Sequence, residues 1–125
     1  MRTRLALLLW VTSPDAPQLC ATPFFHAAAA AAMDVVVEIH FASRSVLLLV
    51  DGVAAKLYAG RDEAMSVYAH MQQAARHGAR FYACSDALVA NGIERTALIP
   101  ETTGVAGAAA FVERALDTQW STLVF

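Results

Sequence analysis

Hydrophobic residues come in short blocks along the chain, and polar turn residues separate them. Residues 3–12 form an almost unbroken apolar run, which predicts a strand buried on both faces. Two more blocks, 34–41 and 79–83, are rich in β-branched or aromatic residues and predict the second and third strands. Residues 96–99 predict a weaker strand that ends at Pro100, and residues 120–125 predict the last one.

Helical spacing fills the gaps between these blocks. The clearest helix spans residues 61–77, where one apolar face lies opposite a polar face and Gly78 provides the C-terminal cap. The run 46–50 is too short for periodicity to separate a strand from a buried helix, and we favour a short helix. Three other helices are predicted. The first starts between residues 18 and 22 and ends at 32, the second spans 85–91 before Gly92, and the third spans 105–116.

This alternation predicts one α/β domain over residues 1–125, with a mainly parallel five-stranded sheet and helices on both faces. Gly104 and Gly107 would then lie at the start of the last helix. They offer backbone N–H groups to an anion, although a packing role is favoured.

Composition narrows the classes of function. The chain is 58% hydrophobic, with a net charge of −2 and a pI near 6.0, which argues against a nucleic-acid-binding protein. Its apolar runs are shorter than the ~20 residues that cross a membrane. The surplus apolar surface, which includes Val105, Ala108, Val112 and residues 123–125, predicts a closed homo-oligomer, with a trimer favoured and a hexamer as the alternative.

The amino-terminal residues allow two interpretations. Arg2 and Arg4 before the apolar run Leu5–Val11 resemble the start of a secretory signal, but no Ala-x-Ala cleavage site follows. A buried first strand is favoured. The two cysteines, without a CxxC motif, point to a reducing cytoplasm.

Cys84 is the leading candidate for chemistry. It follows the third strand, at the sheet edge where ligands bind, and the next helix begins beside it and favours a thiolate. Ser85 and Asp86 would share this crevice, although the Asp86 carboxylate opposes thiolate formation. The alternative is a buried, unreactive thiol.

Two further side chains are crevice candidates. Cys20 could act as a resolving partner for Cys84, although a packed thiol in the first helix is favoured. His40, at the exit of the second strand, could approach the same edge. His70 and His77 fall on the polar face of the 61–77 helix and are expected to be solvated.

Cofactor and metal motifs are weak. The proline-rich turn 13–17 argues against a dinucleotide site, and no two histidines are spaced i, i+4 as a zincin-type metal pair requires. We therefore expect neither a cofactor nor a metal.

The segment Phe81-Tyr82-Ala83-Cys84-Ser85, followed by Asn91-Gly92-Ile93, resembles the cysteine segment of the DsrE/DsrF/TusD-like sulfur-relay family. The second strand, the run 46–50 and the last helix and strand fit the same order. The resemblance implies a three-layer flavodoxin-like subunit, assembled as a homotrimer or hexamer. It also implies sulfur-relay chemistry in which Cys84 carries a sulfane sulfur as a persulfide between donor and acceptor proteins.

The sequence is compatible with three functions. The first is a sulfur carrier or sulfurtransferase that uses Cys84. The second is a non-catalytic oligomeric subunit that binds a small ligand or a partner. The third is a thiol-redox protein in which Cys20 and Cys84 form a pair.

Overall fold

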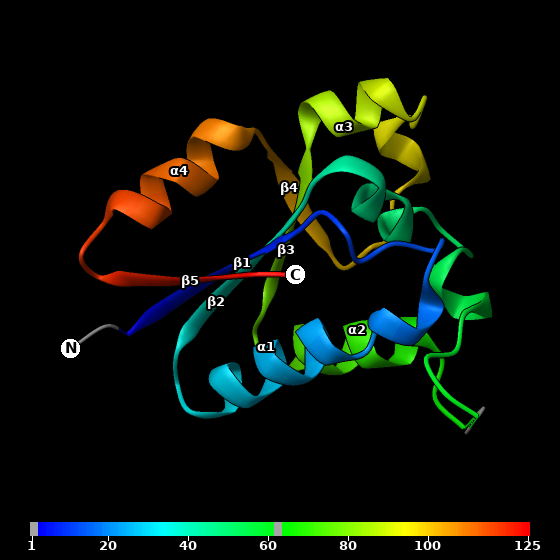
Figure 1. The fold of residues 1–125 in the computed structure, drawn as a ribbon, viewed down its shortest axis with the longest axis horizontal. Helices are drawn as coiled ribbons and strands as arrows, with labels where there is room; N and C mark the ends of the chain where they lie inside the picture. Colours follow the sequence, from blue (N-terminus) through cyan, green and yellow to red (C-terminus); the bar gives the residue numbers. More distant parts are fainter. Residues whose placement is uncertain (1–2, 62–63) are drawn as a thin grey trace.

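Five parallel strands form one sheet in the computed structural model, which describes residues 3–61 and 64–125. Their order across the sheet is β4-β3-β2-β1-β5 (Figure 1). The strands are β1 (Arg4–Leu9), β2 (Val36–Phe41), β3 (Arg80–Cys84), β4 (Thr102–Ala106) and β5 (Trp120–Val124). The helices are α1 (Thr22–Ala32), α2 (Val67–Arg76), α3 (Ser85–Ala90) and α4 (Ala108–Leu116). Short 3-10 helices complete the set: η1 (Pro17–Leu19), η2 (Ser43–Leu49), η3 (Ala54–Lys56) and η4 (Arg95–Ala97).

Helices cover both faces of the sheet, so the predicted α/β, three-layer flavodoxin-like architecture is confirmed. Figure 1 shows α1 and α2 side by side below the sheet and α4 on the opposite side. Because α4 connects the two edge strands, β4 and β5, it must cross the whole sheet. This long crossover places α4 over the central strands.

On the three central strands, the side chains that face α1 and α2 are apolar. Alternate residues of the central strands point to this face, and Phe41 and Phe81 of this set meet the ring of Phe24 from α1 at centroid distances of 6.1 and 6.2 Å. Met71 and Ala74 from α2 are buried in the same cluster. This layer is the hydrophobic core of the protein.

The face of the sheet toward α4 carries buried polar side chains. Glu38 and His40 point to it, and each is buried, at 4% and 6% exposure. Phe111 and Arg114 of α4 contact them. A strand that alternates polar and apolar residues, as β2 does, usually exposes its polar side chains to water. In this protein α4 covers them.

The fourth strand differs from the prediction. In the segment predicted as a strand, the 3-10 helix η4 ends at Ala97 and Leu98 makes one antiparallel bridge to Val50, whereas the strand lies at Thr102–Ala106. Gly104 therefore lies inside β4 opposite Tyr82, and Gly107 precedes α4. The pairing with β3 contains a bulge, in which the Thr103 hydroxyl accepts a hydrogen bond from the Phe81 N–H at 3.2 Å.

Two other predicted helices can be compared with the structure. The short helix favoured for 46–50 is confirmed as the 3-10 helix η2. The helix predicted from residue 61 begins at Val67, where the Ser66 side chain accepts a hydrogen bond from the Ala69 N–H at 3.1 Å. Residues 62 and 63 of that prediction lie outside the described residues. Within the described part of the chain, no helix is both long and apolar enough to cross a membrane.

Phe24→Ala is expected to lower the free energy of unfolding by about 3–5 kcal/mol, because the ring is 1% exposed and its loss leaves a cavity between α1 and the sheet. Urea unfolding measures the change. Phe25→Ala is the matched control, since the neighbouring ring is 53% exposed, and its loss should be clearly smaller. Equal losses would contradict this assignment of the core.

Candidate functional site

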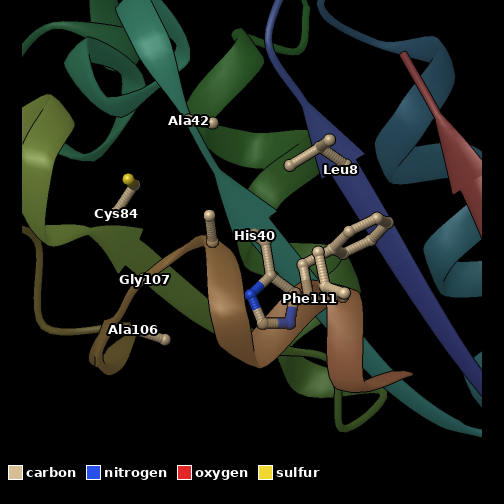
Figure 2. Close-up of a pocket in the computed structure, with 9 residues that line it drawn as sticks. Leu8, His40, Ala42, Cys84, Ala106, Gly107 and Phe111 are labelled. Carbon is tan, nitrogen blue, oxygen red and sulfur yellow. The ribbon is translucent and has the colours of Figure 1, made fainter. Parts of the chain in front are cut away.

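A cavity of about 210 Å³ opens at the carboxyl ends of the strands (Figure 2). The ends of β1 to β4 form one wall and the first turns of α4 form the other. The lining residues are Leu8, His40, Ala42, Cys84, Ala106, Gly107, Ala108, Phe111 and Val112. Most of these side chains are apolar, and the volume suits a small, largely uncharged molecule.

Cys84 brings a thiol to this cavity. It is the last residue of β3 and the capping residue before α3, so the chain changes direction at this position. The residue is partly exposed, and Figure 2 shows its sulfur at the cavity, across from Leu8 and Phe111. A free thiol that is neither sealed in the core nor paired is available to small molecules that enter here.

Cys20 has a different environment. Its thiol is fully buried and donates to the carbonyl oxygen of Ser13 at 3.2 Å and of Ala16 at 3.6 Å. Burial raises the pKa of the Cys20 thiol to about 11. Cys20 does not line the Cys84 cavity. The arrangement therefore gives no support to a redox pair and fits the packed-thiol interpretation.

Ser85 and Asp86, which were expected to share the crevice with Cys84, do not line the cavity. Ser85 begins α3, and a Cβ atom added at Gly107 would lie 3.8 Å from its hydroxyl oxygen. Asp86 is exposed in the first turn of α3 and does not line the cavity.

His40 is the polar side chain in the cavity wall. Its Nε2 lies 3.1 Å from Oε1 of Glu38. Its ring stacks on Tyr82 at a centroid distance of 5.4 Å and meets the edge of Phe111 at 5.6 Å. Burial lowers the pKa of His40 below the ordinary histidine value, against the opposing effect of the Glu38 carboxylate.

Glu38 and Arg114 form an ion pair beside the cavity that the sequence analysis did not anticipate. Arg114 donates to both carboxylate oxygens of Glu38, at 3.1 and 3.3 Å, and its guanidinium lies 4.6 Å from the centroid of the Trp120 ring. Burial acts to raise the pKa of Glu38, but the hydrogen bonds from Arg114 and His40 outweigh it and lower the pKa. The signal in the sequence was the spacing of Glu38 and His40 two residues apart on a strand, which puts both on one face.

His70 is less solvated than predicted. Its ring packs edge-on against Phe25 at 4.8 Å, and burial lowers its pKa. His77 is exposed, as predicted. In the ranges 3–61 and 64–125, no group of three His, Cys, Asp or Glu side chains is placed to hold a metal ion.

Comparisons with known proteins agree with this fold. The DsrE/DsrF-like family profile matches residues 6–125. The YchN protein from E. coli superposes with a TM-score of 0.75 at 12% sequence identity, over 100% of both chains. MTH1491, a protein of unknown function from Methanobacterium thermoautotrophicum, superposes with a TM-score of 0.67 at 20% identity, over 98% of both chains. No curated protein matches significantly. The two solved structures share the fold with this chain.

The free energy of unfolding is expected to fall as the pH drops below about 6.5. His40 and His70 have lowered pKa values in the folded protein, so the unfolded chain binds more protons in this range. The contribution of these two histidines to the free energy of unfolding is complete above the ordinary histidine pKa. It is lost as the pH falls through their pKa values in the folded protein. Glu38, also lowered, adds a further loss near and below about pH 4.3.

Urea unfolding at a series of pH values tests this expectation. His40→Gln should show a shallower pH dependence than the unchanged chain, whereas His77→Gln, at an exposed position, should not change it. The assignment is wrong if the His40→Gln curve keeps the full slope.

Proposed function

We propose that this chain, which belongs to the DsrE/DsrF-like family, is a sulfur carrier or sulfurtransferase that holds a sulfane sulfur on Cys84 as a persulfide. The observation that carries the proposal is the position of Cys84. Its thiol opens on a small apolar cavity at the carboxyl edge of a parallel sheet, whereas the thiol of Cys20 is sealed in the core.

The transfer step balances within the reacting pair. The Cys84 sulfur attacks the terminal sulfur of a donor persulfide and forms a new S–S bond. The S–S bond of the donor breaks, and its electron pair leaves on the remaining donor sulfur. A thiol is thereby oxidised to a persulfide while the donor persulfide is reduced to a thiol, and no outside oxidant is needed. An acceptor thiol then removes the sulfur from Cys84 by the same exchange, and a donor or acceptor protein is the expected partner.

Mass spectrometry tests the proposal. The Cys20→Ser chain, which keeps Cys84 as its only thiol, should gain the mass of one sulfur atom on incubation with ethyl persulfide generated in the assay. The gain should map to the Cys84 peptide and reverse with dithiothreitol. Cys20→Ser combined with Cys84→Ser is the matched control and should gain nothing.

A folded Cys20→Ser chain that never acquires sulfur on Cys84 would contradict this function. The apolar cavity would then favour the second candidate, a non-catalytic subunit that binds a small ligand. In that case Cys84→Ser would leave ligand binding and assembly intact.

We propose in addition that the chain forms a closed homo-oligomer, a trimer in preference to a hexamer. Apolar side chains are exposed on α4 and on β5, and β5 forms an edge of the sheet because, among the described residues, it pairs with β1 alone. Val112, Leu116, Leu123 and Val124 are 52%, 81%, 39% and 57% exposed. Contact between copies along these two elements would remove this surface from water.

Light scattering at micromolar concentration should give the mass of an oligomer. Leu116→Lys is expected to lower that mass, because it places a charge in the apolar surface of α4. Val89→Lys on α3 is the matched control, since Val89 is 83% exposed and lies away from α4 and β5, and it should not change the mass. A monomeric unchanged chain would refute the proposed assembly.

A further inference from the structure

His40 is fixed from several sides within the cavity wall. Nε2 lies at hydrogen-bond distance from Glu38, Tyr82 stacks on one face of the ring, and Phe111 meets it edge-on. Glu38 is itself fixed by the two bonds from Arg114. The imidazole therefore has one defined orientation, which is what a group that handles protons in a site requires.

The hydrogen bond to Glu38 decides which ring nitrogen carries the proton. An ionised carboxylate only accepts hydrogen bonds, so Nε2 must be the protonated nitrogen. Nδ1 of the neutral ring then carries a lone pair, and it has no hydrogen-bond partner among the residues that the structure describes. This arrangement leaves a proton acceptor in a wall that is otherwise apolar.

His40 and Cys84 lie on the same face of adjacent strands. His40 pairs in register with Tyr82, and Cys84 follows two residues later, so both side chains point toward α4. Parallel strands lie about 4.8 Å apart and rise about 3.3 Å per residue, which puts such diagonal Cα atoms about 8 Å apart. Both residues line the one cavity (Figure 2), so a molecule that occupies the cavity can contact the thiol and the imidazole.

We propose that His40 is the proton acceptor and donor for the Cys84 cavity, and that Glu38 is the positioning residue that keeps Nδ1 free. The proposal rests on sulfur transfer at Cys84. As the Cys84 sulfur attacks the donor persulfide, its proton passes to Nδ1. As the S–S bond of the donor breaks, Nδ1 returns this proton to the departing sulfur, which leaves as a neutral thiol.

The lining of the cavity gives the physical reason for such a shuttle. A thiolate leaving group that departs among apolar side chains is strongly disfavoured. A histidine that takes and returns one proton keeps the chain, the donor and the product neutral before and after the transfer. Charge then develops only in the transition state, next to the imidazolium.

Four groups face His40 and set its response to pH. Glu38 lies on its own strand, Arg114 faces it from α4, and Tyr82 and Cys84 face it from β3. Burial, which favours the neutral ring, outweighs the carboxylate, which favours the charged one. His40 is therefore a competent proton acceptor at neutral pH and loses this capacity only in acid.

Transfer kinetics test the inference in the Cys20→Ser background. His40→Gln keeps a donor toward Glu38 but has no basic nitrogen, and it should slow sulfur transfer from ethyl persulfide to Cys84 on the order of 10²-fold. The fall in rate toward acid pH that His40 imposes should disappear as well. His77→Gln is the matched control and should leave both the rate and its pH profile unchanged.

The outcomes separate the two proposals. If no variant acquires sulfur, sulfur transfer itself is wrong. If His40→Gln acquires sulfur with an unchanged rate and pH profile, transfer at Cys84 stands and the role of His40 is overturned. Alkylation of Cys84 by iodoacetamide gives a second measure of thiol reactivity, and it should slow in His40→Gln and not in His77→Gln.

A spectroscopic measurement tests the tautomer of His40 in the unchanged chain and the positioning role of Glu38 in a variant. ¹⁵N NMR of the unchanged chain should show His40 at neutral pH with the proton on Nε2 and an unprotonated Nδ1. In Glu38→Gln, whose amide can also donate to the ring, the form protonated on Nδ1 should become populated. A proton on Nδ1 of the unchanged chain would overturn the inference.

Discussion

A buried carboxylate in the middle of the sheet organises one whole side of this protein. Glu38 lies on a central strand at 4% exposure, where an unpaired charge would be costly. Arg114 meets this requirement with two hydrogen bonds, and the Trp120 ring supports the guanidinium. Because Arg114 belongs to α4, the ion pair fixes where this helix lies on the sheet. The position of α4 in turn sets the wall of the cavity that Cys84 faces.

The two faces of β2 show why the fold could be predicted from the sequence while the site was only partly visible. Apolar periodicity and turn residues indicated an α/β protein with a parallel sheet, since these signals are local. The alternation of Glu38, Ile39 and His40 is local as well, but it has two physical solutions. Polar residues on alternate positions can face water, or they can be buried beneath a helix that supplies a counter-charge. That helix is 76 residues away in sequence at Arg114, so no local pattern selects the second solution.

The fourth strand was misplaced for a related reason. Residues 96–99 carry strand-forming side chains, but they lie at the end of the 3-10 helix η4 and in a single bridge to Val50. The strand that pairs with β3 contains Gly104, which has low intrinsic strand preference. It holds its place through tertiary structure: a bulge at Thr103, whose hydroxyl satisfies the Phe81 N–H, and the ring of Tyr82 lying 3.9 Å from where a Cβ at Gly104 would be. The sequence does predict Cys84 at a strand exit, because the end of β3 has strong local signals on both sides.

Position, rather than the helix that follows it, is what sets Cys84 apart as a site for chemistry. α3 has only six residues and carries the exposed Asp86 carboxylate in its first turn. An apolar cavity also disfavours a standing negative charge. A thiol in such a place reacts readily only if its proton can leave as the new bond forms, and the one ring nitrogen in the cavity wall that Glu38 leaves free is Nδ1 of His40. The same carboxylate that positions α4 thus also determines which proton acceptor Cys84 meets.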